Sequence, residues 1–375
     1  MKSNDIVIVG GGLGGLTAAI HLKGLGYSVL VIEKKKYPHH KVCGEYVSNE
    51  IMPYLQSLGI DLKQSGAVAI DTLQISTRTG ASIKTELPLG GIGISRYAFD
   101  MLLYKKALTL GVIFKFETAT SIRFYDDLFE VQTDASVTYM ASIVIGAYGK
   151  RSGLDKVLQR DFIENKSSWL AVKGHYSYPD FPDNLVALHN FKGGYGGLSK
   201  TESGNINFCY LVNYQSFKEY NGIEDFNNEI VAENPHLKTF LQKANPIFDA
   251  PMTIAQISFE SKNAVENHVL MCGDAAGLIH PLCGNGMAMA IHAAKIASEH
   301  VHRFLENKSY TRNHLELDYE TKWNKAFRQR LWIGRRVQSV LLSEGLSKAA
   351  MATAIKSPKL LKSLIRRTHG KPINV

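Results

Sequence analysis

A run of glycines directly after a short apolar stretch near the N-terminus constrains this chain more than any other feature. Residues 5–9 are almost wholly apolar and β-branched, which is typical of a parallel strand buried on both faces. Gly10, Gly12 and Gly15 follow at the spacing G-x-G-x-x-G, and residues 13–25 carry apolar side chains at helical intervals. The sequence therefore predicts a strand, a tight turn and a helix whose N-terminal N–H groups face an anion.

The three glycines have different expected tasks. Gly10 makes the tight turn, Gly12 lets the backbone approach a pyrophosphate, and Gly15 lets the helix pack against the strand. A second strand over residues 27–32 ends at Glu33, about 20 residues beyond the turn, where an acidic side chain can accept hydrogen bonds from ribose hydroxyls. Glu33 favours a dinucleotide whose ribose carries no 2′-phosphate.

Lys34 opens a run of three lysines directly after this acid. Two interpretations stay open for the run. The cations approach the adenosine or pyrophosphate of the ligand, or they form an ordinary solvated loop.

Composition and charge restrict the class of protein. The chain has 375 residues, 45% of them hydrophobic and 21% charged, as in ordinary globular enzymes. No stretch approaches the ~18 consecutive apolar residues of a membrane span, and the N-terminus has no signal-peptide layout, so we expect a cytoplasmic protein. The four cysteines are far apart, which suggests neither a zinc site nor a disulfide framework. We expect no metal.

The formal charge of +9 is unevenly distributed. Residues 311–375 contain fourteen Lys and Arg against four Asp and Glu, so the remaining 310 residues carry a net charge of −1. This distribution argues against a nucleic-acid partner and favours a local basic helical surface. Three alternatives stay open for such a surface: contact with an anionic membrane, which would make the protein peripheral at the inner membrane face, contact with an acidic partner, or exposure to water alone.

The middle of the chain predicts a second, sheet-rich module. Residues 68–76 and 81–87 alternate as a hairpin, and residues 90–93 are expected to interrupt it. Residues 169–209 scatter aromatic side chains among glycines and prolines, and residues 193–197 look like their most irregular point. A helix is expected from Ser95 as N-cap to about residue 110. Arg96 in its first turn opposes the helix dipole, so we interpret it as an anion contact or as an indifferent exposed arginine.

A second strand, loop and helix near residue 270 repeats the design of the N-terminus. A buried strand over 268–272 is followed by a loop with Gly273, Asp274, Pro281, Gly284 and Gly286, and then by a long helix to about residue 305. The loop offers one carboxylate and several N–H groups to an anionic or electron-rich group. Beyond residue 311 we expect only helices, with a break at the Ser-Pro pair at 357.

Together these motifs resemble the FAD-dependent oxidoreductases of the p-hydroxybenzoate hydroxylase fold. This superfamily includes aromatic-ring monooxygenases, flavin-dependent halogenases and geranylgeranyl reductases. The resemblance covers the chain to about residue 310. It implies an α/β fold: a Rossmann-like FAD-binding domain with a parallel sheet, an inserted antiparallel β-sheet substrate domain and a C-terminal helical segment. We expect the FAD-binding domain at 1–65, 95–165 and 258–310, the substrate domain at 66–94 and 166–257, and the basic helical region at 311–375.

The resemblance also implies which residues bind FAD. The first loop would hold the pyrophosphate, Glu33 the adenosine ribose, Arg96 the phosphate and ribityl side, and Asp274 the ribityl chain or pyrophosphate side. The loop from Pro281 to Met287 would place N–H groups near the part of the flavin ring that gains negative charge on reduction. The full set of expected cofactor-binding residues is Gly10, Gly12, Leu13, Gly14, Gly15, Glu33, Lys34, Arg96, Gly273, Asp274, Pro281, Gly284, Asn285, Gly286 and Met287.

Two signatures of the superfamily are altered in this chain. Tyr148-Gly149 replaces the usual Asp-Gly pair, which weakens the expectation of direct reduction by NADPH, although NAD(P)H or another reductant must supply electrons. The tryptophan-rich signature of the halogenases is missing. Cys43-Gly44 resembles an element of the geranylgeranyl reductases, and Tyr195 matches the tyrosine of their substrate-sheet motif, whose Trp, Phe and Pro are absent.

The expected activity is oxidation or reduction of a small molecule by FAD. The first hypothesis is a monooxygenase that hydroxylates an aromatic or polyketide-like substrate with O₂ through a flavin C4a-hydroperoxide. The alternative is a geranylgeranyl reductase-like enzyme that reduces C=C bonds of an isoprenoid or other lipid-like substrate. Tyr195, His175 and Cys43 are the candidate catalytic residues, and each has the competing interpretation of an ordinary buried side chain.

Overall fold

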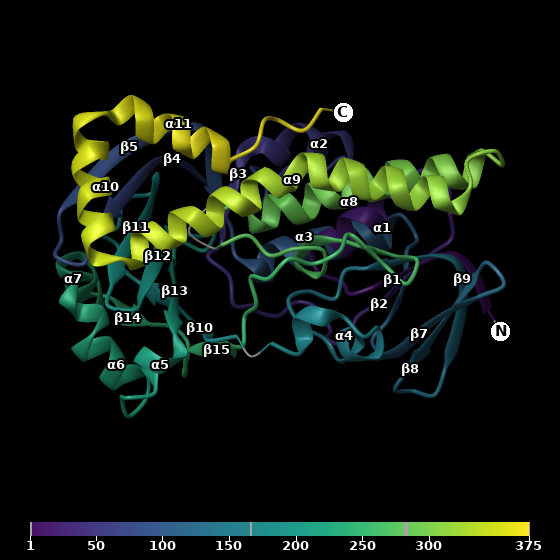
Figure 1. Ribbon diagram of the computed structural model, residues 1–375, viewed down its shortest axis with the longest axis horizontal. Coiled ribbons are helices and arrows are strands. Elements are labelled where there is room, and N and C mark those ends of the chain that lie inside the picture. The colour runs from purple at the N-terminus through teal and green to yellow at the C-terminus, as the bar shows by residue number, and fades with distance from the viewer. Residues whose placement is uncertain (1, 166, 281–283, 375) are drawn as a thin grey trace.

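A parallel sheet and a larger, mostly antiparallel sheet organise the computed structural model, which describes residues 2–165, 167–280 and 284–374 (Figure 1). In the first sheet the strand order is β16-β17-β9-β1-β2-β6, and β1, β2, β6, β9 and β17 run parallel. The glycine turn follows β1, which lies between β2 and β9, so the loops after β1 and β9 open at the same edge. The expected α/β fold is confirmed.

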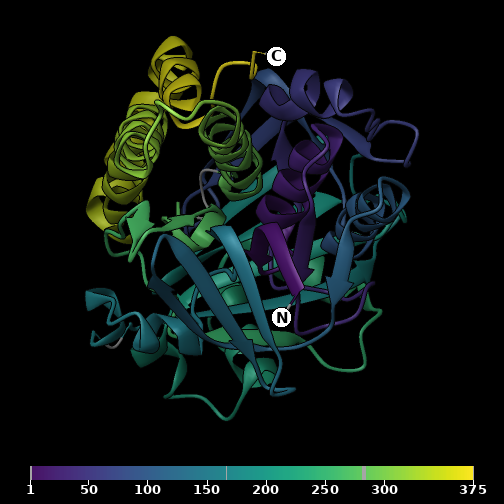
Figure 2. The ribbon, with the colours of Figure 1, turned by 90° about the vertical axis from the view of Figure 1, so that its right-hand side faces the viewer.

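The opening unit forms as the sequence predicts. Strand β1 (Lys2–Val9) leads into α1 (Leu13–Gly24) and then β2 (Val29–Ile32). Ile6, Val7 and Ile8 are fully buried, because this strand has neighbours on both sides and helices on one face. Helix α1 packs between α3 and α8, and α9 packs outside α8 (Figure 2).

The remaining elements of the first sheet alternate with these helices, and β7, β8 and β9 form an antiparallel meander. Their bounds are α3 (Arg96–Thr109), β6 (Ile113–Lys115), β7 (Ala119–Tyr125), β8 (Leu128–Thr133), β9 (Thr138–Gly146), α4 (Gly153–Val157), η2 (Asp161–Ile163), β16 (Val265–Glu266), β17 (Val269–Met271), η4 (Gly273–Ala275), α8 (Gly286–Glu306) and α9 (Arg312–Leu342). The Ser95 side chain accepts a hydrogen bond from the N–H of Ala98, so the predicted N-cap of α3 is confirmed.

The second sheet has the order β14-β10-β13-β12-β11-β4-β5-β3, with β15 also paired to β10. All its neighbours are antiparallel except β11 and β4. The 46–48 segment, which the sequence assigns to the FAD-binding domain, pairs with β5 of this sheet. The bounds are β3 (Tyr46–Ser48), η1 (Asn49–Ile51), α2 (Met52–Ser57), β4 (Val68–Ser76), β5 (Ser82–Gly93), β10 (Trp169–Ser177), β11 (Leu185–Phe191), β12 (Gly194–Lys200), β13 (Ile206–Asn213), α5 (Tyr214–Phe217), α6 (Ile223–Glu229), η3 (Val231–Glu233), α7 (Pro235–Lys243), β14 (Asn245–Pro246) and β15 (Met252–Ala255).

Two glycine clusters that were expected to interrupt the second sheet belong to its strands. Gly91 and Gly93 lie within β5, where a Cβ would come within 2.4 Å of the Tyr46 ring and 1.9 Å of the Lys200 carbonyl oxygen. Gly194 lies in β12, with the Leu211 carbonyl oxygen 2.3 Å from the corresponding position. These glycines allow close approach of neighbouring chain, so the prediction of irregular structure was wrong.

Three helices follow α8 and extend over both sheets. After α9, helix α10 (Glu344–Lys356) and helix α11 (Pro358–Thr368) turn at Ser357, which confirms the predicted break. Helix α11 lies across β4 and β5 (Figure 1). Arg330 of α9 forms an ion pair with buried Glu50 (3.1 Å), and Ile373 donates its N–H to the Glu50 carbonyl oxygen. None of the helices that the structure describes is long and apolar enough to cross a membrane.

Candidate functional site

A cavity of about 510 Å³ lies where the loops of the parallel sheet meet the second sheet. Its walls come from the turn after β1, the loop 39–46, the segment 147–151, the turn after β17 and the start of α8 on one side. Strands β4, β5, β11, β12 and β15 form the other side. The cavity therefore joins the two loops that the sequence singles out to the predicted substrate sheet.

The glycine turn is shaped for a ligand as well as for packing. Gly10 has φ +106°, and a Cβ there would lie 2.3 Å from the Ala147 carbonyl oxygen. A Cβ on Gly15 would lie 1.9 Å from the Gly10 carbonyl oxygen, whereas a Cβ on Gly12 would lie no nearer than 3.7 Å to any described atom. Gly12, Leu13 and Gly14 line the cavity. Gly10 and Gly15 are not among the lining residues, and they hold the turn against its own strand.

The acidic residue after β2 lies beside this turn. Glu33 accepts a hydrogen bond from the Gly11 N–H through Oε2 (2.6 Å) and one from the Lys35 N–H through Oε1 (3.1 Å). Glu33 and Lys34 both line the cavity. The carboxylate is therefore fixed at the end of the cavity nearest the first turn, as the ribose assignment requires.

Arg96 points toward the same turn, but its guanidinium is already paired. Its Nε and Nη2 donate to the two oxygens of Asp100 at 2.7 and 2.8 Å, and Lys41 Nζ donates to Asp100 at 2.8 Å. Burial alone would raise the pKa of Asp100, but Arg96 and Lys41 outweigh burial and lower it below its ordinary value of 3.8. Two cations against one carboxylate leave a net positive charge beside Gly12, which suits a pyrophosphate.

The second loop forms the opposite end of the cavity. Gly273, Asp274, Gly284, Asn285, Gly286 and Met287 all line it, whereas Pro281 lies outside the described residues. Asn285 is fully buried and donates Nδ2 to the Thr368 carbonyl oxygen (3.0 Å). Its Oδ1 has no hydrogen-bond partner among the residues that the structure describes, which leaves a buried acceptor on a residue that lines the cavity.

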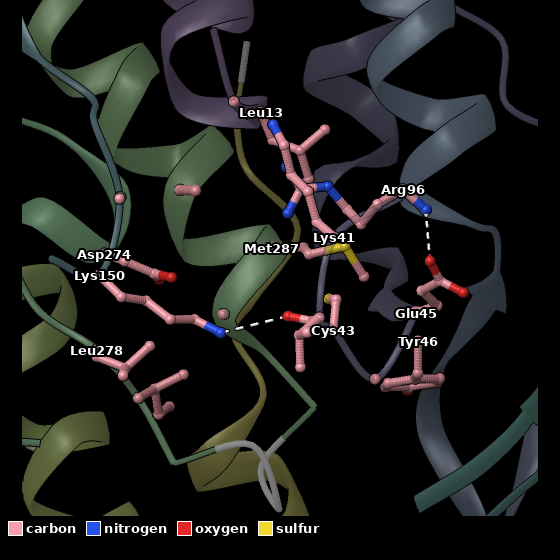
Figure 3. Close-up of a pocket in the computed structure, with 18 of the residues that line it drawn as sticks. Leu13, Lys41, Cys43, Glu45, Tyr46, Arg96, Lys150, Asp274, Leu278 and Met287 are labelled. Carbon is pink, nitrogen blue, oxygen red and sulfur yellow. Dashed lines mark hydrogen bonds between the residues drawn. The ribbon is translucent and has the colours of Figure 1, made fainter. Parts of the chain in front are cut away.

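Lys150 adds a cation near this end. Its side chain extends from beside Asp274 toward Cys43, and Nζ donates to the Val42 carbonyl oxygen at 3.3 Å (Figure 3). The expected Asp-Gly signature is thus replaced by a segment whose lysine reaches into the cavity.

These features fit a long, anionic dinucleotide. An open glycine face and net positive charge stand at one end, and a carboxylate, Asn285 and a helix N-terminus stand at the other. The unpartnered Asn285 oxygen can accept a hydrogen bond from a ring N–H. The residues present therefore suit FAD.

The second sheet gives the cavity an apolar side. The side chains that contribute are Leu73, Leu87, Val186, Leu188, Leu198 and Ile254, and Leu278 extends the same surface from the loop after β17. Ligand pockets with this lining select apolar substrates through burial rather than through hydrogen bonds.

A buried ion network joins the two sheets beside the cavity. Glu45, with φ +54°, accepts hydrogen bonds from Lys173 Nζ (2.5 Å), His175 Nε2 (2.7 Å) and the Arg96 N–H (2.8 Å). Both Glu45 and Lys173 are fully buried. Burial would raise the pKa of Glu45, but the His175 hydrogen bond and Lys173 lower it below its ordinary value of 4.5.

The candidate catalytic residues take different positions. His175 belongs to the buried network, stacked on Phe248 with ring centroids 4.7 Å apart, and is not among the lining residues. Tyr195 is buried in β12 and packs beside Leu278, also outside the lining. Cys43 lines the cavity. His40, Glu45 and His175 hold ligand atoms within 4.8 Å of one another, but Lys173 already neutralises the shared carboxylate, which favours an ion network over a metal site.

Several site residues were missed from the sequence. Lys41 and Glu45 lie between β2 and β3, and His369 reaches the cavity directly after α11; none of the three was among the expected site residues. Lys173 had a usable signal, since it is a lone charge directly after the apolar run 169–172 and within the expected strand. A buried lysine in a strand requires a carboxylate partner.

The model of the FAD binding domain family matches residues 3–308 of this chain. Digeranylgeranylglycerophospholipid reductase of Methanosarcina acetivorans is 25% identical over 340 residues, covering 86% of this chain and 80% of that protein. Conditioned medium factor receptor 1 of Dictyostelium discoideum is 22% identical over 332 residues, covering 78% of this chain. The match spans only 62% of that relative's own length.

Solved structures share the fold. The flavin-dependent brominase Bmp2 superposes with a TM-score of 0.81 at 18% identity, covering 98% of this chain and 93% of the brominase. PqsL, a probable FAD-dependent monooxygenase from Pseudomonas aeruginosa, gives a TM-score of 0.74 at 15% identity, covering 94% and 100% of the two chains. At these identities the likeness concerns the fold alone.

Proposed function

For this chain, which belongs to the FAD binding domain family and is an FAD-dependent oxidoreductase, we propose that the reaction is reduction of C=C bonds in an apolar, isoprenoid-like substrate. The observation that carries this proposal is the division of the cavity. Its dinucleotide end is charged and rich in glycine, and its substrate-sheet side is lined by branched aliphatic side chains. An unfunctionalised hydrocarbon chain fits such a surface better than a polar aromatic ring does.

The sequence relatives support the same choice. The similar protein of Methanosarcina acetivorans is named for reduction of a digeranylgeranyl lipid. The present chain differs from the geranylgeranyl reductases at the Trp, Phe and Pro of their substrate motif, so we propose the substrate class and not the same substrate.

Reduced FAD supplies a hydride when it is bound, and NAD(P)H or another two-electron donor restores it. One alkene carbon would gain this hydride and the other a proton, so the double bond would become a single bond with both electrons supplied by the reduced cofactor. Cys43 is the candidate that holds this proton at Sγ, because it lines the cavity between Lys150 and Met287 (Figure 3). Asp274 and Asn285 position the cofactor, and the aliphatic wall excludes water.

Hydroxylation of an aromatic or polyketide-like substrate with O₂ is a second candidate function. His40 lines the cavity, and its ring stacks on Tyr97 with centroids 4.7 Å apart and contacts Phe248. His40 thus gives the lining a polar group backed by aromatic rings, and the fold-related PqsL is described as a probable monooxygenase.

Anaerobic mixing tests the reductase proposal. FAD-loaded protein is photoreduced, mixed with a geranylgeranyl-substituted lipid without oxygen, and followed by flavin absorbance and product mass. We expect the flavin to be reoxidised in proportion to the saturated product, because the alkene is the electron acceptor. Reoxidation that occurs only when oxygen is admitted would reject the proposal.

A pair of cysteine variants tests the proton donor. Cys43→Ala should slow reoxidation by the lipid by about 100-fold, the usual contribution of a positioned acid. Cys209→Ala is the control, because Cys209 does not line the cavity and burial raises its pKa to about 12. Equal rates in the two variants would show that Cys43 is not the proton donor. The substrate class would still be tested by the anaerobic measurement.

A further inference from the structure

We propose that the outer face of helices α10 and α11, with the end of α9, docks on an anionic phospholipid bilayer. Large apolar side chains of these helices are exposed to solvent, and those of α10 lie on both flanks of its buried side, because Leu346 and Ile355 are nine residues apart. Trp332 is 53% exposed, Ile355 53% and Leu360 57%, and Leu346 and Leu364 are exposed beside them. We call these five residues and the cations among them the C-terminal face.

The C-terminal face is strongly cationic. Residues 332–375 contain nine Lys and Arg and one Glu. The exposed cations among them are Arg335, Arg336, Lys348, Lys356, Lys359, Arg366, Arg367 and Lys371. Apolar side chains interspersed with Lys and Arg on a helix surface are the pattern of interfacial helices, whose apolar residues enter the acyl boundary while the cations contact anionic headgroups.

In helix α11 the residues that pack on the second sheet differ from those that belong to the C-terminal face. Leu361 and Ile365 are buried against Ile70 and Leu87 of the second sheet. Leu360 and Leu364 lie four residues apart on the neighbouring side of the helix, about 100° around its axis from Leu361 and Ile365, and both are exposed. The outer leucines are therefore not needed to hold the helix on the protein, and their exposure requires another explanation.

The same helix packs behind one wall of the cavity. Leu87 both packs with Leu361 and lines the cavity, and His369, directly after α11, also lines it. Helix α11 runs along the edge of the molecule across β4 and β5 (Figure 1). A bilayer on the C-terminal face would therefore lie one helix away from the apolar side of the cavity, where a lipid-like substrate would enter.

Exposure alone does not single out this face. Leu317 on α9 is 58% exposed, but it stands between Glu316 and Asp318, with Glu320 nearby. An anionic bilayer would repel that position. Leu317 thus matches Leu360 in exposure but has acidic neighbours along its helix, which makes it the control.

Vesicle sedimentation tests the proposal with full-length, FAD-loaded protein and without substrate, so the outcome is independent of the proposed reaction. We expect binding to phosphatidylglycerol–phosphatidylcholine vesicles, with much weaker binding to phosphatidylcholine alone or at high salt. The double variant Leu360→Glu/Leu364→Glu and the triple variant Lys359→Gln/Arg366→Gln/Arg367→Gln should each weaken binding by about tenfold or more. Leu317→Glu should bind like the parent protein.

Flavin content and thermal unfolding, measured on every variant, show that the fold is intact, since all the changed side chains are exposed. Failure of the parent protein to sediment with anionic vesicles would overturn the proposal. So would binding that survives in both the leucine and the cation variants. Equally tight binding to RNA, insensitive to the leucine changes, would identify a general polyanion surface and would also overturn it.

Discussion

An alanine substitution would place its Cβ in different surroundings at Gly12 and at Gly15, so the two variants test cofactor binding and folding separately. Gly12→Ala adds a Cβ that faces the cavity near Arg96 and Lys41, so we expect unchanged unfolding of the apoprotein and FAD affinity reduced by about tenfold or more. Gly15→Ala forces a Cβ against the Gly10 carbonyl oxygen and should destabilise the fold by about 1–3 kcal/mol. Thermal unfolding and flavin fluorescence titration measure both. Normal FAD affinity in a folded Gly12→Ala protein would show that the pyrophosphate lies elsewhere.

Lys173 and Glu45 form a fully buried ion pair whose loss has a predictable cost. Lys173→Met leaves the Glu45 carboxylate buried with one cation fewer, and we expect a loss of about 3–5 kcal/mol of unfolding free energy. Glu233→Gln, in a half-exposed pair with Arg78, should cost no more than about 1 kcal/mol. Urea unfolding at neutral pH gives both values. A comparable small effect for the two variants would show that the buried pair contributes little.

The pH dependence of this network follows from the lowered pKa of Glu45. Because the folded pKa lies below the ordinary value of 4.5, the contribution is fully present above that pH and is lost as the pH falls toward the folded pKa. Lys173→Met should remove part of this acid sensitivity.

His369, directly after helix α11, makes the stability of the fold depend on pH. Burial lowers the pKa of His369 to about 4 from its ordinary value of 6.5. The unfolded chain therefore binds more protons between these values, and stability is lost as the pH falls from 6.5 to 4. We expect His369→Gln to reduce the slope of unfolding free energy against pH by up to about 1.4 kcal/mol per pH unit. Urea unfolding at pH 7 and pH 5 measures the slope, and an unchanged slope would contradict the assignment.

Local elements were predictable because their signals are local. The strand, turn and helix at 5–25, the N-cap at Ser95 and the break at Ser357 depend on residues a few positions apart. The Glu45 network joins residues 128 and 130 positions apart, which no local pattern encodes. The predictions for Gly91, Gly93 and Gly194 were wrong because glycine occurs both in turns and in strands that a neighbouring chain segment approaches closely.

At the scale of the molecule, two strand-loop-helix units hold a cavity from opposite ends while the second sheet supplies its apolar side. The sequence predicted both loops and the sheet as separate features. It did not predict that α11 packs behind the cavity wall and brings His369 into the lining, because that contact depends on how the C-terminal helices turn back over β4 and β5. The substrate assignment depends on this assembled arrangement.

A single turnover under ¹⁸O₂ tests that assignment most directly. Reduced, FAD-loaded protein is mixed with the isoprenoid lipid in the presence of ¹⁸O₂, and the product is analysed by mass spectrometry. We predict a product that has gained two hydrogen atoms and no ¹⁸O, since the alkene accepts the hydride beside the aliphatic wall. A product that contains ¹⁸O and keeps its double bonds would contradict it and establish the protein as a monooxygenase.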